Sequence, residues 1–160
     1  MDNLIKENEL IKKILSVSKT IAMIGVSSIK EEDLKNVKRK PSIIVMKYMQ
    51  EFGYKVIPVN PFSAGQEVNG EKIIANIKDI KIPIDIVDVF RPSKEALDIL
   101  YQTIQVGAKT IWLQYGIHDE NAKKVAEEKK INYISNKCIK QEYQKYFLKM
   151  NPVFPVLRNK

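Results

Sequence analysis

Small and hydroxyl-bearing residues follow an apolar segment near the start of the chain, and this combination can bind phosphate. Gly25, Val26, Ser27 and Ser28 come directly after the apolar run. A turn of small residues lets backbone N–H groups and hydroxyls approach a phosphate group. We therefore take this turn as a candidate anion site, with a glycine that only eases packing under a helix as the alternative.

A second candidate anion site lies at the predicted start of a helix. Arg39, Lys40, Pro41 and Ser42 place two cations and a hydroxyl at a point where proline favours the first helical turn. Free N–H groups and the helix dipole attract anions at such a position. The alternative is a solvated run of charge beside an ordinary helix start.

A third candidate is Arg91, which directly follows a predicted strand. Its planar guanidinium can donate several hydrogen bonds to one phosphate or carboxylate. Arg91 is therefore a candidate ligand-binding cation, and a salt bridge to Asp88 or Glu95 is the alternative.

The remaining reactive side chains favour structural roles. Asp85 and Asp88 are three positions apart in one strand, so they point to opposite faces and do not converge as an acid–base pair. We expect His118 to be an exposed helix cap, Cys138 to be a buried or inert thiol, and Trp112 to lie in the core. No nucleophile with a plausible base is evident in the sequence.

The elements that must position these residues alternate between short apolar strands and amphipathic helices. The predicted strands span residues 20–26, 54–59, 84–90, 110–113 and 131–134. The predicted helices span residues 3–16, 41–52, 92–106, 118–129 and 139–148. Alternation of this kind is typical of βαβ units in a parallel sheet with helices on both faces. The sequence therefore predicts an α/β fold with a doubly wound, mainly parallel sheet in three α/β/α layers.

In such a sheet, ligands bind beyond the carboxyl ends of the strands, where the strand order reverses. Besides the first turn, the residues at these ends are Asn60-Pro61, Phe90-Arg91 and Gln114. The first turn has one glycine instead of the three of a dinucleotide fingerprint, and no acid follows the second strand. This pattern disfavours an NAD(P)-dependent oxidoreductase, which stays as the alternative function.

Length, charge and composition limit the remaining classes of function. The 160 residues suit one domain, because domains commonly hold roughly 100–200 residues. All but three of the 27 basic residues are lysines, so the net charge of +8 is weak support for nucleic-acid binding, our third hypothesis. One cysteine and one histidine exclude an internal disulfide and a multi-histidine metal site. Without an apolar span or signal-peptide core, we expect a cytoplasmic protein.

Six blocks of the sequence, in this order and spacing, resemble the small single-domain coenzyme A-binding proteins. The blocks are residues 21–28, 40–48, 53–61, 85–91, 107–114 and 136–140. The family's domain is Rossmann-like and similar to the N-terminal domain of the succinyl-CoA synthetase alpha subunit. The resemblance runs from about Lys19 to Tyr143. It implies a coenzyme A-binding domain over residues 19–147, with a lead-in helix at 1–18 and an irregular tail at 148–160.

The resemblance also implies where coenzyme A would bind. Its pyrophosphate would lie over the first turn, near the helix that follows, and its nucleotide would lie between the ends of two strands. The implied cofactor-binding residues are Gly25, Val26, Ser27, Ser28, Lys40, Pro41, Ser42, Asn60, Pro61, Val89, Phe90, Arg91 and Gln114. The expected function is binding of coenzyme A or an acyl-CoA without evident catalytic residues, serving acyl-CoA metabolism through a partner. A homo-oligomer or an unidentified protein partner is left open.

Overall fold

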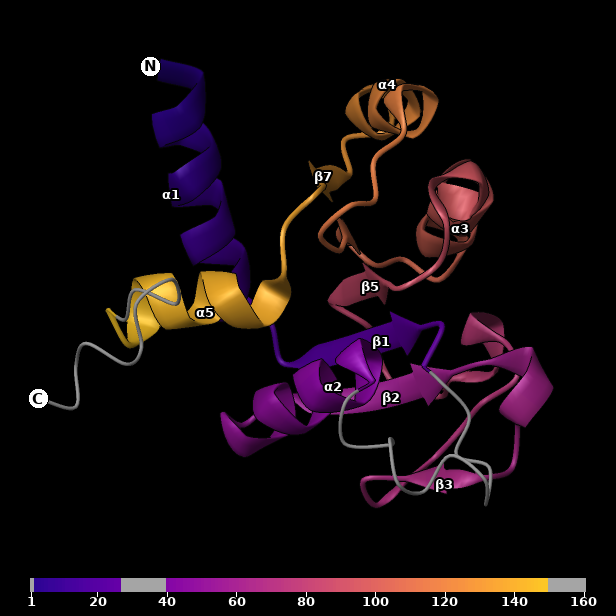
Figure 1. Cartoon of the computed structure of the whole chain (residues 1–160). Helices are drawn as coiled ribbons and strands as arrows, with labels where there is room; N and C mark the ends of the chain where they lie inside the picture. The colour runs from indigo at the N-terminus through magenta and orange to yellow at the C-terminus, as the bar shows by residue number, and fades with distance from the viewer. Residues whose placement is uncertain (1, 27–39, 150–160) are drawn as a thin grey trace, which may run out of the picture.

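The computed structural model describes residues 2–26 and 40–149, and a five-stranded parallel sheet lies at its centre (Figure 1). The strands lie in the order β2-β1-β5-β6-β7. Their bounds are Thr20–Ile24 for β1, Lys55–Val59 for β2, Ile86–Val89 for β5, Thr110–Leu113 for β6 and Asn132–Ile134 for β7. Each neighbouring pair is parallel. This confirms the predicted Rossmann-like α/β fold.

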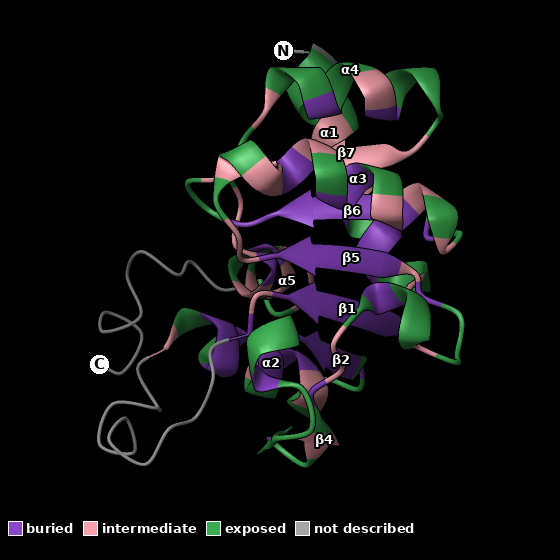
Figure 2. Cartoon of the chain, turned by 90° about the vertical axis from the view of Figure 1, so that its right-hand side faces the viewer, coloured by how far each residue is buried: buried purple, intermediate pink, exposed green. Residues whose placement is uncertain are grey.

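Helices cover both faces of the sheet, as Figures 1 and 2 show. One face carries α1 (Asp2–Val17), α2 (Pro41–Glu51) and α5 (Ile139–Phe147), and the other carries α3 (Ala96–Gln105) and α4 (Glu120–Glu128). Each helix turns apolar side chains toward the sheet, and its exposed residues form the outer surface (Figure 2). The sheet therefore separates two apolar cores, which we call the α2 face and the α3 face.

The strands are almost wholly buried because helices cover them on both sides, which explains their continuous apolar sequences. Trp112 in β6 has no exposed surface, as predicted, and its Nε1 donates to the Lys137 carbonyl. Helix α1 belongs to the same core, because its Ile11, Ile14 and Leu15 are buried among the residues of the α2 face.

The connection from β2 to β5 is built from short elements. Two 3-10 turns, η3 (Pro61–Ser63) and η4 (Ile77–Asp79), flank a hairpin of β3 (Glu67–Val68) and β4 (Glu71–Lys72). The predicted turn at Asn69-Gly70 joins these two strands, and both turn residues have positive φ. The connection thus returns the chain to the sheet on the far side of β1.

The strand order reverses between β1 and β5. Strand β1 is followed in sequence by its neighbour β2, whereas β5 is followed by β6 on its opposite side. The chain therefore leaves the carboxyl ends of β1 and β5 in opposite directions. A crevice at such a switch point is where open α/β sheets bind ligands.

Two helices begin later than predicted. The segment after Pro92 first forms a 3-10 turn, η5 (Ser93–Glu95), and α3 starts only at Ala96. Helix α4 starts at Glu120 instead of His118, because the Asp119 carboxylate accepts from the Ala122 N–H at 2.8 Å and caps the helix.

Candidate functional site

Gly25 occupies a position that no other residue type fits without strain. Its φ is +91°, and a Cβ there would lie 2.8 Å from both the Phe90 carbonyl oxygen and the Arg91 Cδ. The Gly25 N–H donates to the Val59 carbonyl, and the Phe90 N–H donates to the Ile24 carbonyl. Close packing is thus a real role for Gly25, and it brings the ends of β1, β2 and β5 together at the switch point.

A hollow with a polar rim, which we call the first hollow, opens beside this turn with a volume of about 160 Å³. The ends of β1 and β2, the loop after β5 and helix α3 surround it. Its lining includes Gly25, Asn60, Pro61, Phe62, Arg91, Glu95, Asp98 and Gln102. The apolar part of the wall comes from Ile24, Val59, Ile77 and Ile99, which belong to the α3 face.

Arg91 pairs with Glu95 at the rim of the first hollow. Its Nε and Nη2 donate to the two carboxylate oxygens at 3.1 and 2.8 Å. Hydrogen bonding lowers the pKa of the Glu95 carboxyl and raises that of the Arg91 guanidinium. The Arg91 side chain is still 42% exposed. Of the two salt-bridge partners considered for Arg91, the structure shows Glu95, and a solvent-exposed pair of this kind exchanges partners at little cost.

Asn60 uses its side chain to shape the first hollow. Its Nδ2 donates to the Val26 carbonyl at 2.7 Å, and its Oδ1 accepts from the Phe62 N–H at 2.9 Å. The second bond caps the turn η3, in which Phe62 is 89% exposed at the rim. Sequence reasoning missed Phe62, although an aromatic residue directly after Asn60-Pro61 was a signal available in the sequence.

A larger, mostly apolar hollow, which we call the second hollow, has a volume of about 530 Å³. It lies between the first turns of α2 and α5. Its lining consists of Pro41, Val45, Phe90, Gln114, Tyr115, Ile117, Cys138 and Gln141. Three of these, Val45, Phe90 and Cys138, pack with the core of the α2 face.

The two hollows therefore open on opposite faces of one sheet edge. Phe90 and Arg91 are the two residues that directly follow β5, and successive side chains along a strand point to opposite faces. Phe90 accordingly lines the second hollow and Arg91 the first. The switch point between β1 and β5 is the place where the two hollows approach each other.

The predicted site residues lie in different places along this edge of the sheet. Gly25, Asn60, Pro61 and Arg91 line the first hollow, and Pro41, Phe90 and Gln114 line the second. Lys40 is the N-cap residue of α2, with Ser42 buried in its first turn. Val26 and Val89 have no exposed surface and pack in the two cores. Ser27, Ser28 and Arg39 lie outside the described residues.

Asp88 is a fully buried carboxyl in the middle of the sheet. Neither of its carboxylate oxygens has a hydrogen-bond partner within residues 2–26 and 40–149. Burial raises the pKa of Asp88 well above its ordinary value. Asp85, in contrast, accepts from the Lys19 and Thr20 N–H groups with one carboxylate oxygen. The two acids thus have separate surroundings, as predicted, and burial disfavours the charged form of Asp88.

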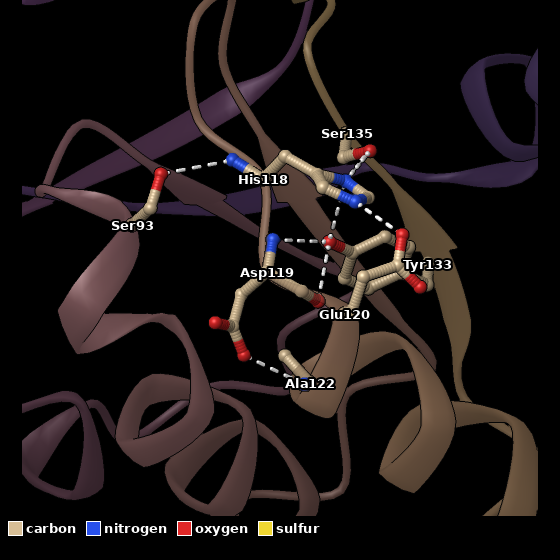
Figure 3. A network of polar contacts seen from close by, with 7 residues as sticks. All are labelled: Ser93, His118, Asp119, Glu120, Ala122, Tyr133 and Ser135. Carbon is tan, nitrogen blue, oxygen red and sulfur yellow. Dashed lines mark hydrogen bonds and ion pairs between the residues drawn. The ribbon is translucent and has the colours of Figure 1, made fainter.

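His118 is tied into a polar network and is not a simple helix cap (Figure 3). Its Nε2 lies 2.7 Å from Glu120 Oε1, its Nδ1 lies 2.9 Å from Ser135 Oγ, and its N–H donates to Ser93 Oγ. Hydrogen bonding to the imidazole lowers the pKa of Glu120. These contacts hold together the loops after β5, β6 and β7 (Figure 3).

The same network also places a serine hydroxyl beside the histidine, a contact that the sequence did not indicate. Ser135 and His118 are far apart in sequence, and the pairing of β6 with β7 brings them together. The other imidazole nitrogen contacts the Glu120 carboxylate, so a hydroxyl, an imidazole and a carboxylate are linked in series. None of the three lines either hollow, and the Glu120 side chain is 68% exposed. The arrangement therefore works here as a connection between loops.

The residues that the structure describes contain no group of three or more His, Cys, Asp and Glu side chains that could hold a metal ion. Within those residues, no helix combines the length and apolar character that a membrane-crossing segment needs.

A doubly wound sheet with hollows on both sides of its switch point is typical of ligand-binding α/β domains. The chain belongs to the family described as "CoA binding domain", whose model matches residues 19–144. The match confirms the resemblance in sequence, and it includes every residue that lines the two hollows.

The relatives of this chain share its fold over most of their length. An uncharacterized protein of Bacillus subtilis (strain 168), YneT, is 37% identical over 130 residues, which cover 81% of this chain and 89% of YneT. The solved structure of cell-free ID.343 from Thermus thermophilus is 34% identical with a TM-score of 0.78, covering 88% of this chain and 98% of its own. A hypothetical protein from Pyrococcus horikoshii OT3 is 36% identical with a TM-score of 0.74, over 87% and 91% of the two chains.

Proposed function

We propose that this protein binds coenzyme A or an acyl-CoA across the carboxyl edge of its sheet, with the nucleotide in the first hollow and the pantetheine arm in the second. The observation that carries the proposal is the pair of hollows on opposite faces of the switch point, bordered by Arg91 on one side and Phe90 on the other. Membership of the CoA binding domain family supports the choice of ligand.

The first hollow suits the charged, aromatic end of the ligand. Arg91 can turn from Glu95 to a phosphate, because both side chains of the pair are partly exposed to solvent. Phe62 offers an exposed ring on which an adenine can stack. The pyrophosphate would lie between the hollows, over the turn at Gly25, whose close packing against Phe90 and Arg91 brings the strand ends together.

The second hollow suits the neutral arm of the ligand. Its walls are mainly apolar, with the amides of Gln114 and Gln141 among them. Apolar walls with a few polar groups are typical of pockets that bind uncharged organic groups. No lining residue singles out one acyl group, so we expect coenzyme A and acetyl-CoA to bind with affinities within about tenfold, or roughly 1.4 kcal/mol.

The alternative ligand, a nicotinamide dinucleotide, fits this edge less well. Dinucleotide-binding folds place an acid after the second strand to accept from the ribose 2′-hydroxyl. Here that place is taken by Asn60, whose amide is engaged with Val26 and Phe62. Coenzyme A instead carries a 3′-phosphate, which favours a rim with a cation such as Arg91.

Calorimetry on ligand-free protein tests the proposal. Titration with coenzyme A or acetyl-CoA should give a measurable heat of binding and a stoichiometry of one ligand per chain. NAD should bind at least about tenfold more weakly. Equal affinity for NAD, or no heat with either coenzyme A species in a folded sample, would refute it. Native mass spectrometry of the purified protein would show which species it carries from the cell.

The proposal extends to the setting of the binding domain. It takes residues 19–147 as the binding unit, with residues 1–18 as a lead-in segment and 148–160 as a tail. It places the protein in the cytoplasm, where it would serve acyl-CoA metabolism through a protein partner or as a homo-oligomer. Gel filtration with light scattering, with and without coenzyme A, tests the last point.

A further inference from the structure

One wall of the first hollow comes from η5 and α3, and three polar side chains lie along it. Glu95, Asp98 and Gln102 all line the hollow, at spacings of three and four residues along the chain. Side chains at these spacings share one face of a helix. The Glu95 carboxylate is paired with Arg91, whereas Asp98 and Gln102 contact each other. These two residues therefore form a separate polar pair on the wall of the hollow.

A hydrogen bond holds Asp98 and Gln102 side by side. Gln102 Nε2 donates to Asp98 Oδ2 at 2.9 Å. The amide nitrogen has two hydrogens and the carboxylate has two oxygens, so this bond uses one donor and one acceptor of the pair. The second oxygen of Asp98 and the second hydrogen of Gln102 can still serve a ligand, because Asp98 is exposed and Gln102 is partly exposed. The pair thus presents an acceptor next to a donor.

An acceptor next to a donor is the complement of one edge of adenine. The base has an amino group at position 6, which donates, beside a ring nitrogen, which accepts. Guanine and hypoxanthine have a carbonyl oxygen at position 6, and a carboxylate repels this oxygen because neither group can donate. Asp98 therefore favours adenine over the 6-oxo purines. The exposed ring of Phe62 lines the same hollow and can stack on the face of the base.

We propose that Asp98 and Gln102 recognise the base of the bound nucleotide and select adenine. Asp98 accepts from the 6-amino group, and Gln102 donates to the neighbouring ring nitrogen. The inference rests on the proposed function, because it takes the nucleotide of coenzyme A to lie in the first hollow. It assigns base specificity to α3 and leaves phosphate binding to Arg91, so the two properties should change independently.

Calorimetry with two forms of the ligand tests the inference. The ligands are coenzyme A and deaminated coenzyme A, in which hypoxanthine replaces adenine and the rest of the molecule is unchanged. The wild-type protein should bind coenzyme A at least about tenfold more tightly than the deaminated form. In Asp98→Asn this preference should fall to about threefold or less, because an amide can donate to the 6-oxo group as well as accept from the 6-amino group.

Asp79→Asn is the matched control, because Asp79 is an exposed acid at the end of η4 that does not line the first hollow. This variant should keep the wild-type preference for adenine, and thermal unfolding of each variant without ligand shows that it is folded. Equal binding of the two ligands by the wild type, or a full preference in Asp98→Asn, would overturn the inference. If coenzyme A binds without a base preference, the proposed function stands while this inference fails; if neither ligand binds, both fail.

Discussion

The two hollows share one sheet edge but differ in the side chains that border them. The first hollow, on the α3 face, is rimmed by Arg91, Glu95 and Asp98 and by the exposed ring of Phe62. The second, on the α2 face, is larger and has mainly apolar walls with one thiol. The difference matches the two ends of a ligand that is charged and aromatic at one end and neutral with a thiol at the other.

A few positions determine which side chains border each hollow. Phe90 and Arg91 are adjacent in sequence, yet each serves a different hollow, because extended chain alternates its side chains. Gly25 packs directly against both residues, and the reversal of strand order leaves the crevice open above it. Changes on one side should therefore affect one end of the ligand, and changes at Gly25 should affect both.

The largest effect is expected from Gly25→Ala. A methyl group there would collide with the Phe90 carbonyl and the Arg91 side chain, which must move to make room. We expect coenzyme A binding to weaken by more than about a hundredfold, or roughly 2.7 kcal/mol, by calorimetry. The left-handed φ adds a loss of stability of about 1–2 kcal/mol.

Gly65→Ala is a matched control for this change. Gly65 has the same φ of +91°, but a Cβ there would meet nothing within 4 Å. The Gly65→Ala variant should lose about as much stability as Gly25→Ala loses through its backbone conformation. It should keep the wild-type affinity for coenzyme A. If both variants bind coenzyme A equally well, the close contact at Gly25 does not shape the site.

A second change concerns the core beneath the second hollow, where Asp88 lies two residues before Phe90. Its pKa is raised by burial, so the folded protein keeps a proton that the unfolded chain loses above pH of about 3.9. The free energy of unfolding should fall as pH rises from there toward the folded pKa, by about 1.4 kcal/mol per pH unit.

Asp88→Asn keeps the shape and removes this titration. The variant should match the wild type near pH 4 and become progressively more stable than it at higher pH, as measured by urea denaturation across that range. A difference that does not change with pH would contradict a neutral Asp88. No comparable pH dependence is expected from the paired, exposed Glu95.

A third change acts on the first hollow only. Arg91→Ala should weaken coenzyme A binding by about tenfold, and by less at high salt, because a charge-assisted phosphate contact is lost and salt screens such contacts. The melting temperature of the ligand-free protein should hardly move, since the pair with Glu95 is exposed. Glu95→Gln removes the competing carboxylate and should bind at least as tightly as the wild type. Lower stability with unchanged affinity would leave Arg91 as a structural ion pair.

The smallest effect is expected from Phe62→Ala. Loss of a stacking ring should cost about 1 kcal/mol, or roughly fivefold in affinity for coenzyme A. Pantetheine, which has no adenine, should bind both proteins alike. Tyr101→Ala is the control, because Tyr101 is an exposed aromatic residue of α3 that does not line the first hollow. An equal loss in both variants would remove adenine stacking from the account.

Much of the fold could be predicted because the strands are buried on both faces and therefore stand out as apolar runs. The prediction for β6 was correct to the residue, whereas the start of α4 was misplaced because Asp119 and not His118 caps it. The candidate site residues were found by their place after strands. The division into two hollows could not be found, because it depends on which face each side chain takes where strands end.

Individual side-chain contacts could not be predicted from the sequence either. Arg91 had two acidic neighbours as candidate partners, and only the turn η5 brings Glu95 to it. Ser135 and His118 become neighbours through the pairing of β6 and β7. Phe62 takes its exposed place in a turn that the Asn60 side chain caps.

The central claim is that one coenzyme A crosses the sheet edge from the first hollow to the second, and a crystal structure of the complex tests it most directly. We predict electron density for the adenine beside Phe62, a phosphate contact from Arg91, the pyrophosphate over Gly25, and the thiol end between Phe90 and Cys138. A ligand confined to one face of the sheet, or bound away from the ends of β1 and β5, would contradict the account.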